Sequence, residues 1–251
     1  MRFSRPDLCL CIAWVLIAFA GLQSVCASID KCQPGKWALT FDDGPDRRNT
    51  LDLLIALKRN NVHATFFIVG CNVEENSDIL KGIHADGHEV AVHTWNHPDL
   101  TTQTDDEIRE QINSTMSVIY KTIGVKPTLM RPPYGYTNER VNRIMVELDL
   151  EVILWNVDSK DWKHVDMYGE NETAWEATKQ TMLTYLHKMN PEKDGGISLQ
   201  HDKHRASVEK LDEIIDAVRK EGYDLSTVTQ CISDRGGYSS PTVIRRVYSA
   251  S

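Results

Sequence analysis

Basic residues are the minority among the charged residues of this sequence. Its 251 residues include 28 lysines and arginines against 36 aspartates and glutamates, which gives a formal net charge of −8. Proteins that bind nucleic acid or an anionic membrane surface through charge present a basic patch. The composition therefore supports neither partner and suits an enzyme with a neutral substrate. Hydrophobic residues make up 41% of the chain, enough to bury a full core.

The sequence also lacks internal repeats, low-complexity runs and a linker rich in proline or serine. We therefore expect a single domain over residues 28–240, followed by a tail of residues 241–251. The tail has no long apolar end of the kind that directs attachment of a lipid anchor, which favours free release.

Long apolar runs are rare, and the one at Leu8–Leu22 follows two arginines. Val25 and Ala27 suit a peptidase that cleaves after Ala27, so residues 1–27 are predicted to be a secretory signal peptide. The alternative is an uncleaved membrane anchor, although the run is shorter than the ~20 residues that usually span a bilayer. We expect secretion to the extracellular space or the cell wall, with no membrane contact after cleavage.

Cysteine is scarce, and removal of the signal peptide leaves Cys32, Cys71 and Cys231. A disulfide between Cys32 and Cys231 would join the two ends of the domain in an oxidising compartment and leave Cys71 free. The alternative is that all three are reduced and buried. Glycosylation sequons at Asn113 and Asn171 are consistent with a secreted glycoprotein.

Short apolar runs alternate with stretches of helical periodicity, which predicts an α/β fold. The predicted strands are 36–41, 64–70, 88–94, 127–131, 151–157, 195–200 and 224–229. The predicted helices are 49–61, 77–87, 104–124, 138–150, 172–189 and 207–222. Thr104 followed by Glu107 is typical of a capping box at the start of the third helix. Alternation of this kind gives a parallel sheet that is doubly wound or closed, and about seven strands favour a (β/α) barrel.

Polar residues follow five of the predicted strands, where parallel α/β folds place their functional sites. One such residue alone would carry little weight, whereas five strand ends together are unusual. The residues concerned are Asp42 and Asp43, His93 and His97, Arg131, then Asp158, Asp161 and Trp162, and finally His201.

His93 and His97 are four residues apart, a spacing that lets two imidazoles converge on one ion from a helical turn. With Asp43 as a third ligand, the set predicts one divalent ion, Zn²⁺ first and Co²⁺ as the alternative. The competing interpretation is a pair of surface or capping histidines without an ion.

The remaining polar residues supply proton carriers. Asp42 can act as a general base beside the ion, and His201 can donate a proton to a leaving group while Asp161 orients it. Ser159 and Ser198 lack the glycine-rich elbow of a serine hydrolase, so we interpret both as structural.

In sequence order, the segments "TFDDGP", "HTWNH", "RPPYG", "DSKDW" and "LQH" resemble the five motifs of the polysaccharide deacetylases, carbohydrate esterase family 4. The resemblance extends from Trp37 to His201, and "HTWNHPDL" with "ILWNVDSKDW" resembles fungal chitin deacetylases in particular. It implies a distorted (β/α)7–8 barrel in a single domain, and metal-dependent removal of acetyl groups from sugar polymers. Fungal members also favour a bond between the ends of the domain.

The resemblance also implies a role for each motif residue. The implied roles are Asp42 as base, Asp43, His93 and His97 as metal ligands, His201 as general acid, Arg131 as the partner of Asp42, Asp161 as the partner of His201, the Tyr134 N–H as an oxyanion donor, and Trp162 with Leu199 as the pocket for the acetyl methyl.

The function expected from this resemblance is a secreted, monomeric deacetylase that converts chitin or chito-oligosaccharides to chitosan and acetate. Another polymer, acetylxylan or peptidoglycan, is the alternative substrate. Two alternatives come from other classes. A chitin-binding protein without turnover is disfavoured by the complete set of base, metal ligands and acid. A metal phosphoesterase is disfavoured by the lack of a glycine-rich phosphate loop.

Overall fold

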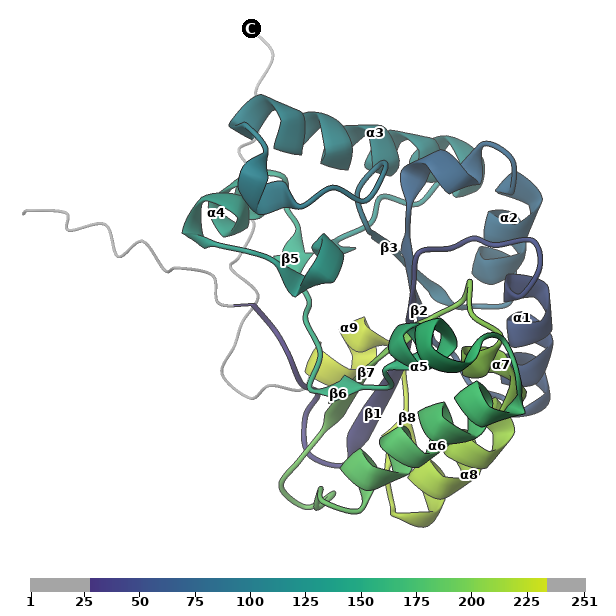
Figure 1. Ribbon diagram of the computed structural model, residues 1–251. Coiled ribbons are helices and arrows are strands. Elements are labelled where there is room, and N and C mark those ends of the chain that lie inside the picture. The colour runs from purple at the N-terminus through teal and green to yellow at the C-terminus, as the bar shows by residue number, and fades with distance from the viewer. Residues whose placement is uncertain (1–27, 234–251) are drawn as a thin grey trace, which may run out of the picture.

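The computed structural model describes residues 28–233, whose strands form one parallel sheet in the order β5-β4-β3-β2-β1-β7-β6, with β8 also paired to β1 (Figure 1). The strands are β1 Lys36–Asp42, β2 Thr65–Ile68, β3 Glu89–Val92, β4 Leu129–Met130, β5 Glu151–Val152, β6 Val157–Asp158, β7 Gly196–His201 and β8 Asp224–Leu225. The first and last strands of this order, β5 and β6, are consecutive in the chain. The expected distorted α/β barrel is therefore confirmed, with an open seam between β5 and β6.

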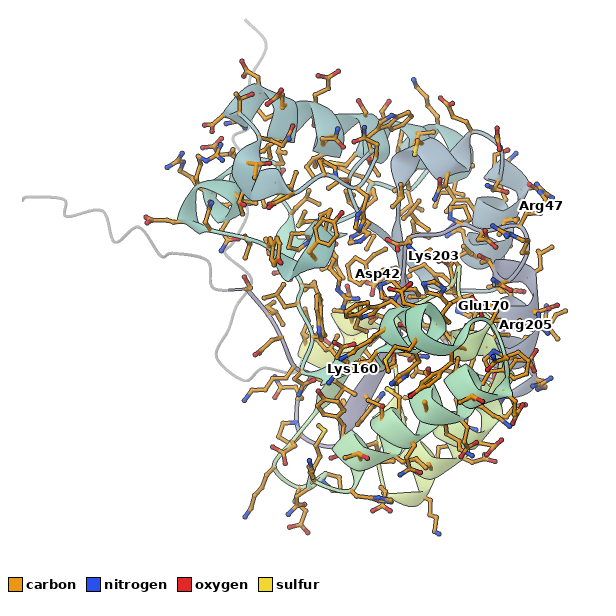
Figure 2. All side chains as sticks on the ribbon, viewed as in Figure 1. Asp42, Arg47, Lys160, Glu170, Lys203 and Arg205 are labelled. Atoms are coloured by element: carbon orange, nitrogen blue, oxygen red, sulfur yellow. A yellow bond between two sulfur atoms is a disulfide. The ribbon has the colours of Figure 1, made fainter. Side chains whose placement is uncertain are left out.

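Helices lie around the outside of the sheet, and apolar side chains of most of them join its buried core (Figures 1 and 2). They are α1 Thr50–Arg59, α2 Ser77–Ala85, α3 Asp105–Ile123, α4 Glu139–Glu147, α5 Asp161–Tyr168, α6 Glu172–Leu186, α7 Ala206–Glu209, α8 Leu211–Lys220 and α9 Val228–Ser233. Short 3-10 turns occupy Gly70–Val73, Leu100–Thr102 and Pro133–Gly135. The capping box of Thr104 and Glu107 forms as predicted at the start of α3.

The stretch 151–157, predicted as one strand, is divided between the two edges of the sheet as β5 and β6. Arg131 causes part of this division, because its Nε donates to the carbonyl of Ile153 at 3.3 Å and its Nη2 to that of Leu154 at 3.1 Å. Those carbonyls face a side chain instead of a neighbouring strand. The N–H of Asn156 then donates to the carbonyl of Ile197, at the opposite edge.

The C-terminal elements also differ from the prediction. The strand expected over 224–229 ends at Leu225, and α9 begins at Val228, whose N–H donates to Thr65 Oγ1 at 2.9 Å. The helix expected over 207–222 is divided into α7 and α8 at Lys210. Helix α5 was not predicted, because its eight residues are too short to show clear periodicity.

Ile29, near the start of the described chain, lies at the seam. It forms a parallel bridge with Ile153, and its N–H donates to the carbonyl of Val152 while its own carbonyl accepts from Leu154. The segment before β1 thus satisfies backbone groups at the open edge of β5, which would otherwise be unpaired.

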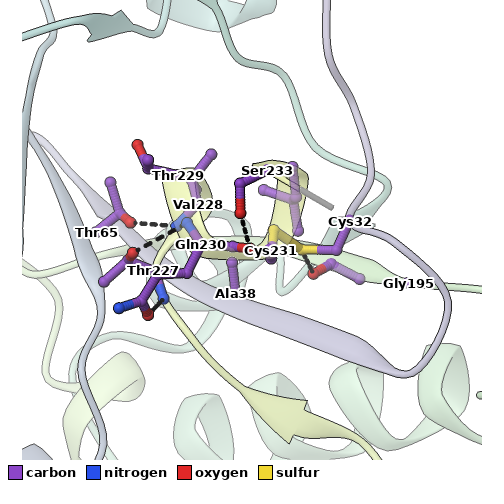
Figure 3. The surroundings of a disulfide bond; sticks show 12 residues. Cys32, Ala38, Thr65, Gly195, Thr227, Val228, Thr229, Gln230, Cys231 and Ser233 are labelled. Carbon is purple, nitrogen blue, oxygen red and sulfur yellow. Dashed lines mark hydrogen bonds between the residues drawn. A yellow bond between two sulfur atoms is a disulfide. The ribbon is translucent and has the colours of Figure 1, made fainter. Parts of the chain in front are cut away.

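Cys32 and Cys231 form a disulfide across 199 residues of sequence, the pairing expected from the sequence (Figure 3). The Gln33 N–H donates to the Cys231 carbonyl at 3.0 Å, so backbone pairing accompanies the covalent bond. Within residues 28–233, Cys71 alone keeps a free thiol. The ends of the domain are thus joined beside β1.

Several sequence predictions stay predictions. The signal peptide of residues 1–27 and the tail of residues 241–251 lie outside the described residues. Asn113 on α3 and Asn171 at the start of α6 are both exposed, as glycan attachment requires. Among the described helices, none combines the length and the apolarity needed to cross a bilayer.

The double variant Cys32→Ser/Cys231→Ser is expected to lower the free energy of unfolding by about 2–5 kcal/mol. The disulfide closes a long loop and so restricts the unfolded chain; without it, the unfolded chain has more conformational entropy. Denaturant unfolding followed by circular dichroism measures the loss. Cys71→Ser is the matched control. A double variant as stable as the wild type would show that the disulfide contributes nothing.

Candidate metal centre and acid–base pair

Strands β1 and β7 place two of the predicted residues side by side. In their parallel register Asp42 is opposite His201, and Thr40 is opposite Leu199. Since side chains two residues apart point to the same face of a strand, all four share one face. This is the face on which Arg131 contacts both Thr40 and Asp42.

Asp43, His93 and His97 come together at the carboxyl ends of β1 and β3. Their ligand atoms all lie within 4.8 Å of one another. Asp43 Oδ1 lies 3.4 Å from His93 Nε2 and 3.3 Å from His97 Nε2. This buried oxygen has no hydrogen-bond partner among the described residues, as expected of an atom directed at a cation. Two imidazoles and a carboxylate with further positions open fit Zn²⁺ or a similar divalent ion.

The two histidines converge from a loop, which corrects the expected helical turn. Thr94 and His97 have φ values of 67° and 63°, in the left-handed region. The His97 N–H donates to Thr94 Oγ1 at 3.0 Å, and Gln111 Oε1 accepts the N–H groups of Trp95 and Asn96 at 2.9 and 3.1 Å. The loop is therefore fixed by side chains instead of by helical hydrogen bonds.

The protonation states of these groups suit metal binding. Burial by itself raises the pKa of Asp43, but the neighbouring His93, together with His201 and Lys203, lowers that pKa well below its usual value. Burial and the neighbouring His93 lower the pKa of His97, which favours the neutral ring. His93 donates its Nδ1–H to the Arg131 carbonyl at 2.7 Å, which orients the ring so that its Nε2 faces Asp43.

Asp42 is held by a completely buried arginine. Arg131 Nη1 donates to Asp42 Oδ1 at 2.7 Å and to Thr40 Oγ1 at 2.6 Å, and its guanidinium lies 4.1 Å from the centre of the Phe67 ring. Asp42 Oδ2 is left 3.8 Å from His93 Nε2. Arg131 thus fixes one oxygen of Asp42, while the other oxygen faces His93, one of the three candidate metal ligands.

His201 and Asp161 form a second buried pair. His201 Nδ1–H donates to Asp161 Oδ1 at 2.8 Å, and the His201 backbone N–H donates to Asp161 Oδ2 at 2.6 Å. Burial disfavours the imidazolium, but the charge and hydrogen bond of Asp161, with the charges of Asp43 and Asp42, raise the pKa of His201 to about 9. Burial likewise opposes ionisation of Asp161, but His201 and the Ser207 hydroxyl lower the pKa of Asp161 to about 2.

The residues expected to contact substrate lie around this site with different exposure. Tyr134, with φ of 60°, packs its ring 4.7 Å from that of His97 and is 59% exposed. Trp162, the second residue of α5, is 43% exposed, whereas Leu199 is buried on β7. The structure adds Tyr136, which sequence reasoning missed; its ring is exposed and lies 5.7 Å from that of Tyr134.

Sequence reasoning also missed Lys203, whose Nζ lies 2.6 Å from Asp43 Oδ2. Its position two residues after His201 was the only available signal. A lysine in a surface turn is too common for that signal to indicate a role. Ser159 and Ser198 are buried and hydrogen-bonded to neighbouring protein atoms, which agrees with their structural interpretation.

Comparison with known proteins points to one family. The sequence model described as "Polysaccharide deacetylase" matches residues 30–153. Two relatives are the peptidoglycan-N-acetylglucosamine deacetylase PgdA of Listeria monocytogenes, 36% identical over 198 residues, and the peptidoglycan-N-acetylmuramic acid deacetylase PdaC of Bacillus subtilis, 39% identical over 193 residues. These matches cover 79% and 77% of this chain but only 39% and 38% of the relatives' own lengths.

A solved structure matches over most of both chains. The chitin deacetylase from the fungal pathogen Colletotrichum lindemuthianum superimposes with a TM-score of 0.76 at 32% identity, covering 83% of this chain and 92% of that one. Sequence match, shared fold and the arrangement of the motif residues agree. The chain belongs to the polysaccharide deacetylase family.

Proposed function

We propose that this chain is a metal-dependent deacetylase that hydrolyses the N-acetyl group of an amino sugar in a structural polysaccharide. The observation that carries the proposal is the meeting of a buried Asp-His-His ligand set with Asp42 and His201, which are paired in register on adjacent strands. A base, a cation site and a protonated acid around one point are what amide hydrolysis requires.

Each residue has a place in the reaction. A divalent ion held by Asp43, His93 and His97 would polarise the acetamide carbonyl and lower the pKa of a water molecule. Asp42 Oδ2, free of Arg131, accepts the proton of the attacking water. His201 uses Nδ1 to bind Asp161, so its Nε2–H is available to protonate the departing sugar nitrogen. The reaction needs no covalent bond to the protein.

For the polymer, we put peptidoglycan first. The relatives at 36% and 39% identity are named as deacetylases of its two amino sugars. Chitin, the polymer expected from the sequence motifs, is the second candidate, supported by the Colletotrichum structure and by the chitin deacetylase 1 of Cryptococcus neoformans at 33% identity. N-acetylglucosamine occurs in both polymers. We further propose that the protein acts as a secreted monomer with Zn²⁺ or Co²⁺.

The first test measures acetate release from peptidoglycan and from a chitin hexamer under identical conditions. We expect release from at least one polymer, its loss on dialysis against a chelator, and its return with Zn²⁺, because the ion activates the attacking water. A higher kcat/KM on peptidoglycan supports the first candidate, and a higher value on chitin the second. Tight binding without acetate would instead show a binding protein.

The two adjacent aspartates are expected to behave differently when replaced. Asp43→Ala removes a ligand, so we expect loss of the bound ion together with activity. Asp42→Asn keeps the ligand set intact, and we expect the ion to remain while kcat falls by about 10²–10⁴-fold, because general-base help is removed. Metal content by atomic emission and kcat on the preferred polymer measure both. If Asp42→Asn also loses the ion, the roles assigned to the two aspartates are wrong.

The role of His201 as general acid predicts how activity depends on pH. His201 must be protonated to donate, and with its pKa near 9 we expect kcat/KM to fall as pH rises through about 9. Asp161→Asn removes the charge that favours the imidazolium, so the pKa of His201 drops and the fall occurs at lower pH. The pH profile of the metal-loaded enzyme measures the shift. Asp166→Asn, which changes an exposed aspartate on the same helix, is the control. If the alkaline side of the pH profile does not move in Asp161→Asn, Asp161 does not set the pKa of His201.

A further inference from the structure

The two carboxylate oxygens of Asp43 face different partners. Oδ1 lies 3.3–3.4 Å from the Nε2 atoms of His93 and His97 and has no hydrogen bond within the described part of the chain. Oδ2 instead lies 2.6 Å from Lys203 Nζ. The proposed ion and the ammonium therefore have separate oxygens on one carboxylate.

The backbone of Asp43 is fixed independently of Lys203. Its φ of 76° is in the left-handed region, its carbonyl accepts from Asn72 Nδ2 at 2.7 Å, and the next carbonyl, of Gly44, accepts from the Val69 N–H at 3.0 Å. With the main chain held in this way, rotation of the carboxylate is the main remaining freedom. Lys203 is the described cation that contacts Oδ2, and so restrains that rotation.

The turn that carries Lys203 is anchored on both sides of it. Asn49 Nδ2, at the start of α1, donates to the Lys203 carbonyl at 2.7 Å. The preceding Asp202 is fully buried and accepts from Thr50 Oγ1 at 2.7 Å. Figure 2 shows Lys203, Glu170 and Arg205 near one another to one side of Asp42.

Glu170 anchors the far side of this turn. Its Oε2 accepts the backbone N–H of Arg205 at 3.1 Å, and its Oε1 lies 3.2 Å from His204 Nδ1. The position of the turn therefore rests on groups other than the Lys203 side chain, which is 46% exposed. A structural role in the fold does not account for its contact with a metal ligand.

We propose that Lys203 is a positioning residue for the metal centre: it holds Asp43 Oδ2 so that Asp43 offers a single oxygen, Oδ1, to the ion. This inference deepens the proposed function and rests on its metal site. A carboxylate that binds through one oxygen leaves one more coordination position for water and substrate than a bidentate one. Hydrogen-bonding partners of ligating carboxylates tune metal affinity in this way.

A second effect of Lys203 acts in the opposite direction. Its positive charge repels a cation bound nearby, so removing the charge would by itself strengthen metal binding. The sign of the change on replacing Lys203 therefore separates positioning from simple repulsion.

The test is titration of the metal-free full-length protein with Co²⁺, followed by its visible absorption. For Lys203→Met we expect binding about 10–100-fold weaker than in the wild type. We also expect a weaker absorption band, because an Asp43 free to bind through both oxygens raises the coordination number. Lys203→Arg is expected to restore both values, since its guanidinium also donates to Oδ2.

Two controls make the outcomes decisive. Lys193→Met removes an exposed lysine before β7, at the other end of that strand, and should bind Co²⁺ like the wild type. Thermal unfolding of metal-free Lys203→Met should match that of the wild type, because the turn is anchored by other residues. Unchanged or tighter Co²⁺ binding in Lys203→Met, with an unchanged spectrum, overturns the positioning role. Failure of the wild type to bind Co²⁺ would overturn the proposed metal site itself.

Discussion

The buried ion pair of Arg131 and Asp42 is the interaction on which the site and its surroundings depend. A charge removed from water costs several kcal/mol unless it is paired and hydrogen-bonded. The Arg131 guanidinium meets this requirement through Asp42, Thr40 and the carbonyls of Ile153 and Leu154. It therefore links β1 to the edge of the sheet where β5 ends. The Arg131 carbonyl also orients His93. One residue therefore contacts the proposed base, a proposed metal ligand and the barrel seam.

This arrangement explains how two carboxylates occupy adjacent positions in the interior. Asp42, at the end of β1, faces Arg131, whereas the left-handed backbone at Asp43 turns the next side chain toward the histidines and Lys203. Each carboxylate therefore has cationic or hydrogen-bonding partners of its own. The like charges are tolerated because Arg131 offsets the charge of Asp42, whereas Lys203 offsets that of Asp43, and His93 lies near both carboxylates.

The sequence was most informative where a local pattern and the fold agree. Asp42, His93, Arg131 and His201 each follow an apolar run, and parallel strands bring such positions to one edge, so their meeting could be predicted. The break in 151–157 could not be predicted, because the partners of its backbone, Arg131 and Ile197, lie elsewhere in the sequence. The same holds for Lys203, whose partner Asp43 becomes visible only in three dimensions. The left-handed turn at Thr94 and His97 was hidden because a spacing of four residues also fits a helix.

The place of β1 in the sheet has a consequence for biosynthesis. One side of β1 pairs with β2, which follows soon after it, whereas the other pairs with β7, which begins at Gly196. While the ribosome is still adding the intervening residues, the proposed metal ligands and the proposed base are already present but the proposed proton donor is not. During that interval one edge of the central strand is unpaired, which is a hazard for aggregation. Pairing of this edge of β1 and arrival of the proposed proton donor therefore both await the segment that begins at Gly196.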